Sequence, residues 1–345
     1  MKILGTLASL AVLIAGLAVA WAWQLSTTPV VLPEPVVVTI PRGASPRSVA
    51  QELEKLGVVD NAELLLLLAR FRGSDRSIRF GVHEFTGSLT PEQVLEELGQ
   101  TPKPTIRITV PEGMTWAEIG TMLEAEGIVG AKKWKQAVCA PSFVSRAGAT
   151  ETANCAEGFL FPDTYHLGPG MTADEIASLM IGRFEQVWDQ LLNEHQIPEI
   201  LTASSNDALL SRNRVTTLAS IVEKETGAAQ ERRRIAGVFA NRLNRKMRLQ
   251  TDPTVIYGIL ASGRAWDGNL RRTDLREATI YNTYVNHGLP PGPICSPGRK
   301  ALAAALDPES VDLLFFVAKG DGTHEFTSNL KDHNRAVRRW QLGRP

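Results

Sequence analysis

The sequence LASIVEKET at positions 218–226 has the period of an α-helix and places a carboxyl group on its apolar face. Four residues spaced i, i+3, i+4 and i+7 share that face: Leu218, Ile221, Val222 and Glu225. Glu223 is rotated off the face, toward solvent. Burial of a carboxyl group is costly unless the group is paired or protonated, and it raises the pKa. The pattern alone leaves two roles open for Glu225: a buried ion pair or helix-end carboxylate, or a general acid with a raised pKa.

Two polar segments follow this helix in the sequence. The first, QTDPTVIY at 250–257, reads as a polar loop that opens a helix, with Thr251 or Asp252 as the cap. The second comprises YNTY at 281–284 and GLPPGPI at 288–294, and neither part has the composition of a core element. Amides that hydrogen-bond sugars and aromatic rings that cover sugar faces are typical of a saccharide groove. Turn scaffolding is the alternative for these loops.

The composition and the motif content exclude several other functions. Lys plus Arg and Asp plus Glu each number 37, so no overall charge indicates nucleic-acid binding, and the basic run at 232–234 is interpreted as a solvated helix face. The sequence has no G-x-S-x-G, H-E-x-x-H, P-loop or dinucleotide-binding motif. Its six histidines are scattered without ligand spacing, so no metal site and no organic cofactor is predicted. A hydrolase with Ser or His chemistry would need a buried Ser–His pair that the sequence does not reveal.

The N-terminus carries an export signal. Residues 4–23 are 20 uncharged, mostly apolar residues, enough to span a bilayer as a helix. Lys2 precedes the run and the next basic residue is Arg42, so the positive-inside rule places residues 1–3 in the cytoplasm and the remainder outside. A cleaved signal peptide is the alternative, because the AVA at 18–20 resembles a cleavage site. Both interpretations export the bulk of the chain.

Export makes a disulfide reasonable. Cys139 and Cys155 bracket a loop rich in small polar residues, and a bond between them would leave Cys295 as a free thiol. Three unpaired cysteines are the alternative.

The composition and pattern of the sequence divide the exported part into regions. Residues 24–36 are proline-rich and predict an extended linker. Residues 37–43, VVTIPRG, are echoed by residues 107–113, RITVPEG, and each copy precedes a helical pattern that ends in glycine. Ser45 and Thr115 are placed to cap these two helices.

Between the copies, the pattern predicts a helix over 62–71, a strand over 81–85 and a helix over 91–98. The expected organisation is one small α/β module over 37–130, a helical connecting region over 131–214 and a catalytic core over 215–345. The run EGFLFPDTY at 157–165 lies in the connecting region, where its aromatic residues either belong to a core or line a sugar cleft.

Several of these stretches resemble the membrane-bound endolytic murein transglycosylases, the YceG-like family. The matching residues are ASIVEKET at 219–226, NRL at 241–243, MRLQTDPTVIYG at 247–258, YNTY at 281–284, GLPPGPI at 288–294 and Asn329. The run at 157–165 is also similar, but Phe159 and Phe161 stand where tryptophans are expected. Cys139 and Cys155 are not part of the family pattern.

The resemblance implies an α+β protein with an N-terminal transmembrane helix, a LysM-like module and a lysozyme-like, mainly helical catalytic domain. It implies Glu225 as the catalytic residue and peptidoglycan glycan strands as the substrate, cleaved between N-acetylmuramic acid and N-acetylglucosamine. It also suggests that the enzyme terminates nascent strands beside peptidoglycan synthases.

The expected mechanism needs one carboxyl group. Glu225 donates a proton to the leaving oxygen, and its carboxylate then takes the proton of the muramic C6 hydroxyl, which attacks C1 and forms a 1,6-anhydro end. The predicted substrate-binding residues are Gln250, Asp252, Tyr257, Asn282, Tyr284 and Asn329. Asp252 could instead be the second carboxylate of a hydrolase or a helix cap. A membrane-tethered peptidoglycan-binding scaffold without catalysis is the competing function.

Overall fold

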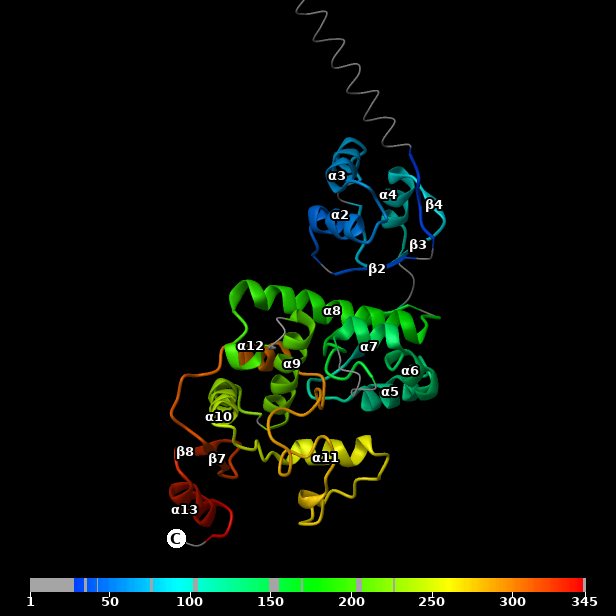
Figure 1. The fold of residues 1–345 in the computed structure, drawn as a ribbon. Helices are drawn as coiled ribbons and strands as arrows, with labels where there is room; N and C mark the ends of the chain where they lie inside the picture. The colour runs from blue at the N-terminus through cyan, green and yellow to red at the C-terminus, as the bar shows by residue number, and fades with distance from the viewer. Residues whose placement is uncertain are drawn as a thin grey trace, which may run out of the picture. The chain divides into compact units, whose positions relative to one another are not determined.

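The computed structural model describes residues 28–33, 36–41, 43–74, 77–101, 105–148, 155–168, 170–202, 207–225 and 227–343. The predicted transmembrane run, residues 4–23, lies outside them. In the ranges that are described, no helix is both long and apolar enough to cross a bilayer. The chain is mixed α+β, mostly helical with small two-stranded sheets, as the fold class predicted (Figure 1).

The chain forms two compact units. Unit 1 comprises the described residues up to Ile108 and those from Tyr165 to Gly170, and unit 2 comprises those from Thr109 to Thr164 and from Met171 onward. The main elements of unit 1 are β1 (Val30–Val31), β2 (Val36–Ile40), α2 (Pro46–Lys55), α3 (Ala62–Phe71), β3 (Gly81–Phe85), β4 (Ser88–Leu89) and α4 (Pro91–Gly99). Two further short strands, β5 (Ile106–Thr109) and β6 (Thr164–Leu167), pair with each other.

Unit 1 has its own hydrophobic core between the β2–β3 sheet and three helices. β2 and β3 are antiparallel, with Val36 opposite Phe85 and Ile40 opposite Gly81. The core residues come from both layers and include Val38, Leu53, Leu65, Phe85 and Leu98. The helix over 62–71, the strand over 81–85 and the Ser45 cap of α2 are confirmed.

The predicted linker over 24–36 is too long, because part of it is strand. Val30 and Val31 pair with Leu89 and Ser88 of β4, so these two residues belong to unit 1.

The two copies of the sequence repeat do not form one module. The second copy supplies α5 (Trp116–Ala125), which Thr115 caps as predicted, but α5 lies in unit 2. It packs against α6 (Ala131–Val138), and the Trp134 indole donates a hydrogen bond of 2.8 Å to the Trp116 carbonyl. The single module predicted over 37–130 is therefore divided, because the apolar face of α5 is buried against α6.

Unit 2 is built around one buried helix. Its remaining elements are α7 (Pro141–Ala147), α8 (Ala173–Glu194), α9 (Ala208–Glu225), α10 (Arg232–Asn244), α11 (Asp252–Ala261), α12 (Arg299–Leu306), β7 (Phe315–Ala318), β8 (His324–Thr327), α13 (Leu330–Trp340) and three short 3-10 helices, Glu199–Leu201, Ala229–Glu231 and Asp274–Arg276. Helices α10, α11 and α12 all pack on α9 (Figure 1). Every residue from 215 to 222 is buried, so α9 has no solvent face over these turns. The predicted boundary between 214 and 215 falls inside α9, and the two predicted regions are one unit.

The aromatic run at 157–165 is largely buried, and its part up to Thr164 belongs to unit 2. Phe159 is fully buried and meets Phe184 of α8 edge to face, with 4.9 Å between the ring centroids. Gly158 has φ of +83°, and a side chain there would collide with Pro293. The sugar-cleft interpretation of these aromatic residues is therefore wrong, because the run packs against α8 and the proline-rich segment.

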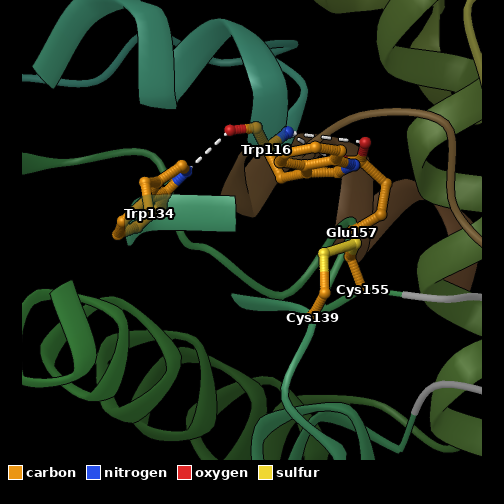
Figure 2. Close-up of a disulfide and its surroundings, with 5 residues drawn as sticks. All are labelled: Trp116, Trp134, Cys139, Cys155 and Glu157. Atoms are coloured by element: carbon orange, nitrogen blue, oxygen red, sulfur yellow. Dashed lines mark hydrogen bonds between the residues drawn. A yellow bond between two sulfur atoms is a disulfide. The ribbon is translucent and has the colours of Figure 1, made fainter. Parts of the chain in front are cut away.

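A disulfide joins Cys139 and Cys155 at the start of this run (Figure 2). Close to it, the buried Glu157 carboxylate accepts the Trp116 amide at 3.1 Å, and the hydroxyl of Tyr257 also bonds it. Burial raises the pKa of Glu157 to about 8 despite these hydrogen bonds. The loop after the disulfide thus connects the N-terminus of α5 to the middle of α11.

We expect the disulfide to contribute measurably to the free energy of unfolding. A Cys139→Ser/Cys155→Ser double variant should lose about 2–4 kcal/mol of unfolding free energy, because the bond restricts the unfolded chain. Denaturant unfolding, with and without reductant, measures the loss. Reductant should destabilise the parent protein and leave the double variant unchanged; equal effects on both would contradict the prediction.

The buried Glu157 should make the free energy of unfolding depend on pH. Its folded pKa of about 8 lies above the unfolded value of 4.5, so the folded state holds the extra proton between these limits. Its contribution to stability is complete below pH 4.5 and is lost as pH rises to 8, by about 1.4 kcal/mol per pH unit at most. Unfolding free energies from pH 5 to 8 should show this slope reduced in Glu157→Gln. Asp189→Asn, on the exposed side of α8, is the control and should retain it.

Candidate active site

Glu225 is the last residue of α9 and is placed where ionisation is disfavoured. Burial raises the pKa of its carboxyl group, and the nearby charge of Asp252 raises it further. The Thr251 hydroxyl and the charges of His324 and Arg242 act in the opposite direction, and burial outweighs them. The partial negative charge at a helix C-terminus also disfavours a carboxylate. The site therefore favours a protonated acid.

Glu223 has a different environment from the one predicted. It does not face solvent, since its side chain is 6% exposed and binds Arg232 at 3.2 Å. Its second oxygen accepts the Gly298 amide at 2.9 Å. Arg232 is consequently buried as well, and the predicted solvated face of the basic run is limited to Arg233 and Arg234. Of the two glutamates, Glu223 forms an ion pair with Arg232, whereas Glu225 accepts a hydrogen bond from the Thr251 hydroxyl.

A groove of about 460 Å³ opens beside Glu225. One wall contains Gln250, Asp252 and Tyr284. The other wall is built by the β7–β8 hairpin and α13, which pack on one another (Figure 1). Its lining residues are Phe315, Phe316, Val317, Ala318, His324, Leu330, His333 and Gln341, and Arg242 completes the groove.

Thr251 connects Glu225 to the first wall. It occupies the N-cap of α11, but its hydroxyl makes no cap bond and donates to Glu225 Oε1 instead. The Thr251 amide donates to the Thr283 hydroxyl at 3.1 Å, and Thr254 bonds the same hydroxyl at 2.8 Å. These bonds hold the backbone at Thr251, the residue whose hydroxyl reaches Glu225. The start of α11 thus supplies the hydrogen-bond donor to the carboxyl group.

The backbone before Thr251 is in an uncommon conformation. Gln250 has φ of +49°, the left-handed region that non-glycine residues rarely adopt, and its amide donates to Thr283 at 3.2 Å. Strained residues of this kind are frequent at functional sites. Next to it, the Tyr284 hydroxyl donates to Asp252 Oδ1 at 2.6 Å, and burial raises the pKa of Tyr284.

Three of the predicted binding residues lie away from the groove lining. Asn282 is fully buried and donates to the backbone oxygens of Asp274 and Glu277, which closes the turn before it. Tyr257 packs edge to face on Tyr281 and bonds Glu157. Asn329 caps α13, accepting an amide at 3.0 Å.

Much of the two polar stretches at 281–284 and 288–294 is interior, contrary to the prediction that neither is a core element. Thr283, Ser296 and Asn282 are buried, and Ile294 donates its amide to the Ser220 hydroxyl of α9 at 3.0 Å. Asn282 and Thr283 are tolerated inside because the Asn282 amide donates to backbone oxygens and the Thr283 hydroxyl accepts the Thr251 amide.

The second wall was not predicted from the sequence. The two short runs at 315–318 and 324–327 flank a Gly-Asp-Gly turn at 320–322, and this spacing is typical of a β-hairpin and could have revealed it. Arg242, inside one of the quoted stretches, also escaped assignment. Its guanidinium donates to the Leu314 and Leu249 carbonyls, at 2.7 and 2.5 Å, so it ties β7 and the start of α11 to α10.

Comparison with known proteins identifies the family to which this chain belongs. The profile of the YceG-like family matches residues 38–339. The chain belongs to the YceG-like family. It is 30% identical over 320 residues to the endolytic murein transglycosylase of Bacillus subtilis (strain 168), covering 88% of this chain and 84% of that one. The resemblance drawn from the sequence is therefore confirmed.

Two further members of the YceG-like family give the same picture. The endolytic murein transglycosylase of Streptococcus pneumoniae serotype 2 is 29% identical over 331 residues, and the match spans 58% of its length. A 2.6 Å crystal structure of a YceG-like protein from Listeria monocytogenes has a TM-score of 0.57 and 28% identity, covering 88% of this chain and 99% of that chain.

Thr251→Val tests the environment of Glu225. Loss of the donated hydroxyl removes a hydrogen bond that lowers the pKa, so the pKa of Glu225 should rise further. Nuclear magnetic resonance titration of labelled glutamate side chains measures the shift. Thr121→Val, whose hydroxyl bonds its own helix in α5, is the control and should leave the titration unchanged. A lower pKa in Thr251→Val would contradict the assigned contact.

Proposed function

We propose that this protein is an endolytic lytic transglycosylase that cleaves peptidoglycan between N-acetylmuramic acid and N-acetylglucosamine and leaves 1,6-anhydro ends. The observation that carries the proposal is Glu225, a carboxyl group with a raised pKa beside a groove with aromatic and polar walls. The curated relatives in the family are named endolytic murein transglycosylases, which supports the same chemistry.

The proposed reaction begins with proton transfer from Glu225. The protonated carboxyl group donates to the glycosidic oxygen while that bond breaks and positive charge develops at C1 of the muramic residue. The C6 hydroxyl of the same residue attacks C1, and its proton returns to Glu225 by the end of the cycle. No water is consumed, so one carboxyl group suffices where a hydrolase uses two.

The groove residues are assigned supporting roles in this proposal. Asp252 and Tyr284 form a hydrogen-bonded pair that presents polar atoms to a sugar, and Gln250 adds an amide. Phe315 and Phe316 provide aromatic surface on the opposite wall. The roles predicted for Tyr257, Asn282 and Asn329 become indirect ones, since their hydrogen bonds hold α11, the 274–282 turn and α13 in place.

The proposal includes a place in the cell. The apolar run at 4–23 would hold the protein in the cytoplasmic membrane, with the N-terminus inside and both units outside. The disulfide supports an oxidising compartment. There, unit 1 would act as the LysM-like glycan-binding module and unit 2 as the lysozyme-like catalytic domain, terminating nascent strands beside peptidoglycan synthases.

Product analysis tests the reaction. The full chain in detergent, incubated with purified peptidoglycan, should release fragments with anhydro-muramic ends, detected by mass spectrometry. Glu225→Gln should lower the rate at least about 100-fold, and the parent activity should fall as pH rises through the raised pKa.

The matched control is Glu223→Gln, two residues earlier on α9. It weakens the ion pair with Arg232, so we expect reduced stability with the same products. Reducing ends alone would indicate hydrolysis with Asp252 as the second carboxylate. Glycan binding without cleavage by the parent protein would favour the scaffold function.

A further inference from the structure

His324 and Glu231 form a buried pair at the edge of the groove, and neither has a role in the reaction proposed above. Glu231 ends the short 3-10 helix before α10, and His324 begins β8. One carboxylate oxygen lies 2.7 Å from His324 Nδ1, and the other accepts the His324 amide at 3.1 Å. The two side chains are 10% and 9% exposed, so the pair is shielded from solvent.

The pair fixes how the imidazole is used. In this pair the Glu231 oxygen accepts from Nδ1, so Nε2 is the nitrogen left facing away from the carboxylate, and in the neutral form of the ring the lone pair lies on Nε2. Phe316 meets the ring edge to face at 5.4 Å and Phe326 lies at 6.2 Å, which restricts its rotation. Within the described part of the chain, no residue hydrogen-bonds Nε2, and His324 lines the same groove as Glu225.

A carboxylate behind an imidazole increases the basicity of the opposite nitrogen and stabilises the imidazolium that forms. The other groove histidine, His333, lacks this arrangement. It stacks on Phe315, and its buried Nδ1 has no hydrogen-bond partner among the described residues. Burial and the charge of Arg242 also lower the pKa of His333. The two histidines are therefore not equivalent as bases.

We propose that His324 is a second catalytic residue of the groove, whose Nε2 accepts the proton of the attacking hydroxyl while Glu231 orients the ring. The inference rests on the proposed function and adds a proton carrier to it. As the C1–O4 bond breaks, O4 takes the proton of Glu225. As the O6–C1 bond forms, the proton of O6 passes to Nε2. Transfer of that proton from His324 to the Glu225 carboxylate restores both groups.

The charged groups around His324 fit its role as a proton acceptor. The groove that His324 lines also contains Glu225, Asp252 and Arg242. Arg234 lies over the ring of Phe326, which neighbours the His324 ring. The groove therefore contains both carboxyl groups and a guanidinium. An imidazolium formed during the reaction would contact Glu231 and share the groove with the newly ionised Glu225, and both negative charges stabilise it.

Chemical rescue tests the inference. In the full chain, His324→Ala should lower the rate of anhydro-end formation about 100-fold, and added imidazole should restore a measurable part of it. Glu231→Gln keeps an oxygen acceptor but removes the charge, and we expect an intermediate loss of about tenfold. His195→Ala, which removes a histidine beside a carboxylate at the end of α8, should keep the parent rate and show no response to imidazole.

The outcomes separate this inference from the proposed function. Loss of activity in Glu225→Gln with a parent rate in His324→Ala would overturn the role of His324 and leave the transglycosylase proposal standing. Activity in both variants would remove the transglycosylase assignment of Glu225 itself. Thermal unfolding of a second variant, His324→Gln, shows whether replacement of the imidazole leaves the fold intact. If this variant is folded and inactive but imidazole does not rescue His324→Ala, the proton-transfer role is also overturned.

Discussion

The complete burial of residues 215–222 of helix α9 is the constraint on which the second unit depends. A helix with several hydroxyl side chains can be surrounded only if each polar group finds a partner. Thr217 donates to the Asn213 carbonyl at 2.8 Å, and Ser220 donates to the Thr217 carbonyl at 2.8 Å while accepting the Ile294 amide. These two hydroxyl groups are therefore satisfied by α9 itself and by the segment that packs on it. This arrangement brings the C-terminal end of α9, with Glu225, to the groove.

The two glutamates at the end of α9 show how local partners separate residues of the same type. Glu223 faces α10 and the start of α12, where a guanidinium and an amide stabilise its charge. Glu225 faces the cap of α11, where a threonine hydroxyl is the hydrogen-bond donor and burial favours the neutral form. A structural carboxylate and a candidate acid are thus two residues apart. The difference comes from what each side chain contacts, because their helix propensity and intrinsic pKa are the same.

The groove depends on segments that are distant in the sequence. Arg242 holds the backbone on both sides, through Leu314 before β7 and Leu249 before α11. On the other side of unit 2, Glu157 joins the N-terminus of α5 to Tyr257 of α11. Helix α11 is therefore held by buried polar contacts in its middle and at its start. The start is the part that reaches Glu225, so these contacts position the site although they do not line it.

The sequence by itself determined many of the local elements and their caps. The Ser45 and Thr115 caps follow from residue type and spacing because those interactions span only a few residues. Helical phase placed Glu225 on the apolar face, but it also placed Glu223 toward solvent, where the structure buries that side chain. Only the tertiary structure decided that Glu223 is buried with Arg232 and that much of the stretches at 281–284 and 288–294 is interior. It also decided that β7, β8 and α13 form the second wall and that Glu231 pairs with His324 there. Those outcomes depend on contacts between residues about 10 to more than 90 positions apart, and periodicity carries no information about such pairs.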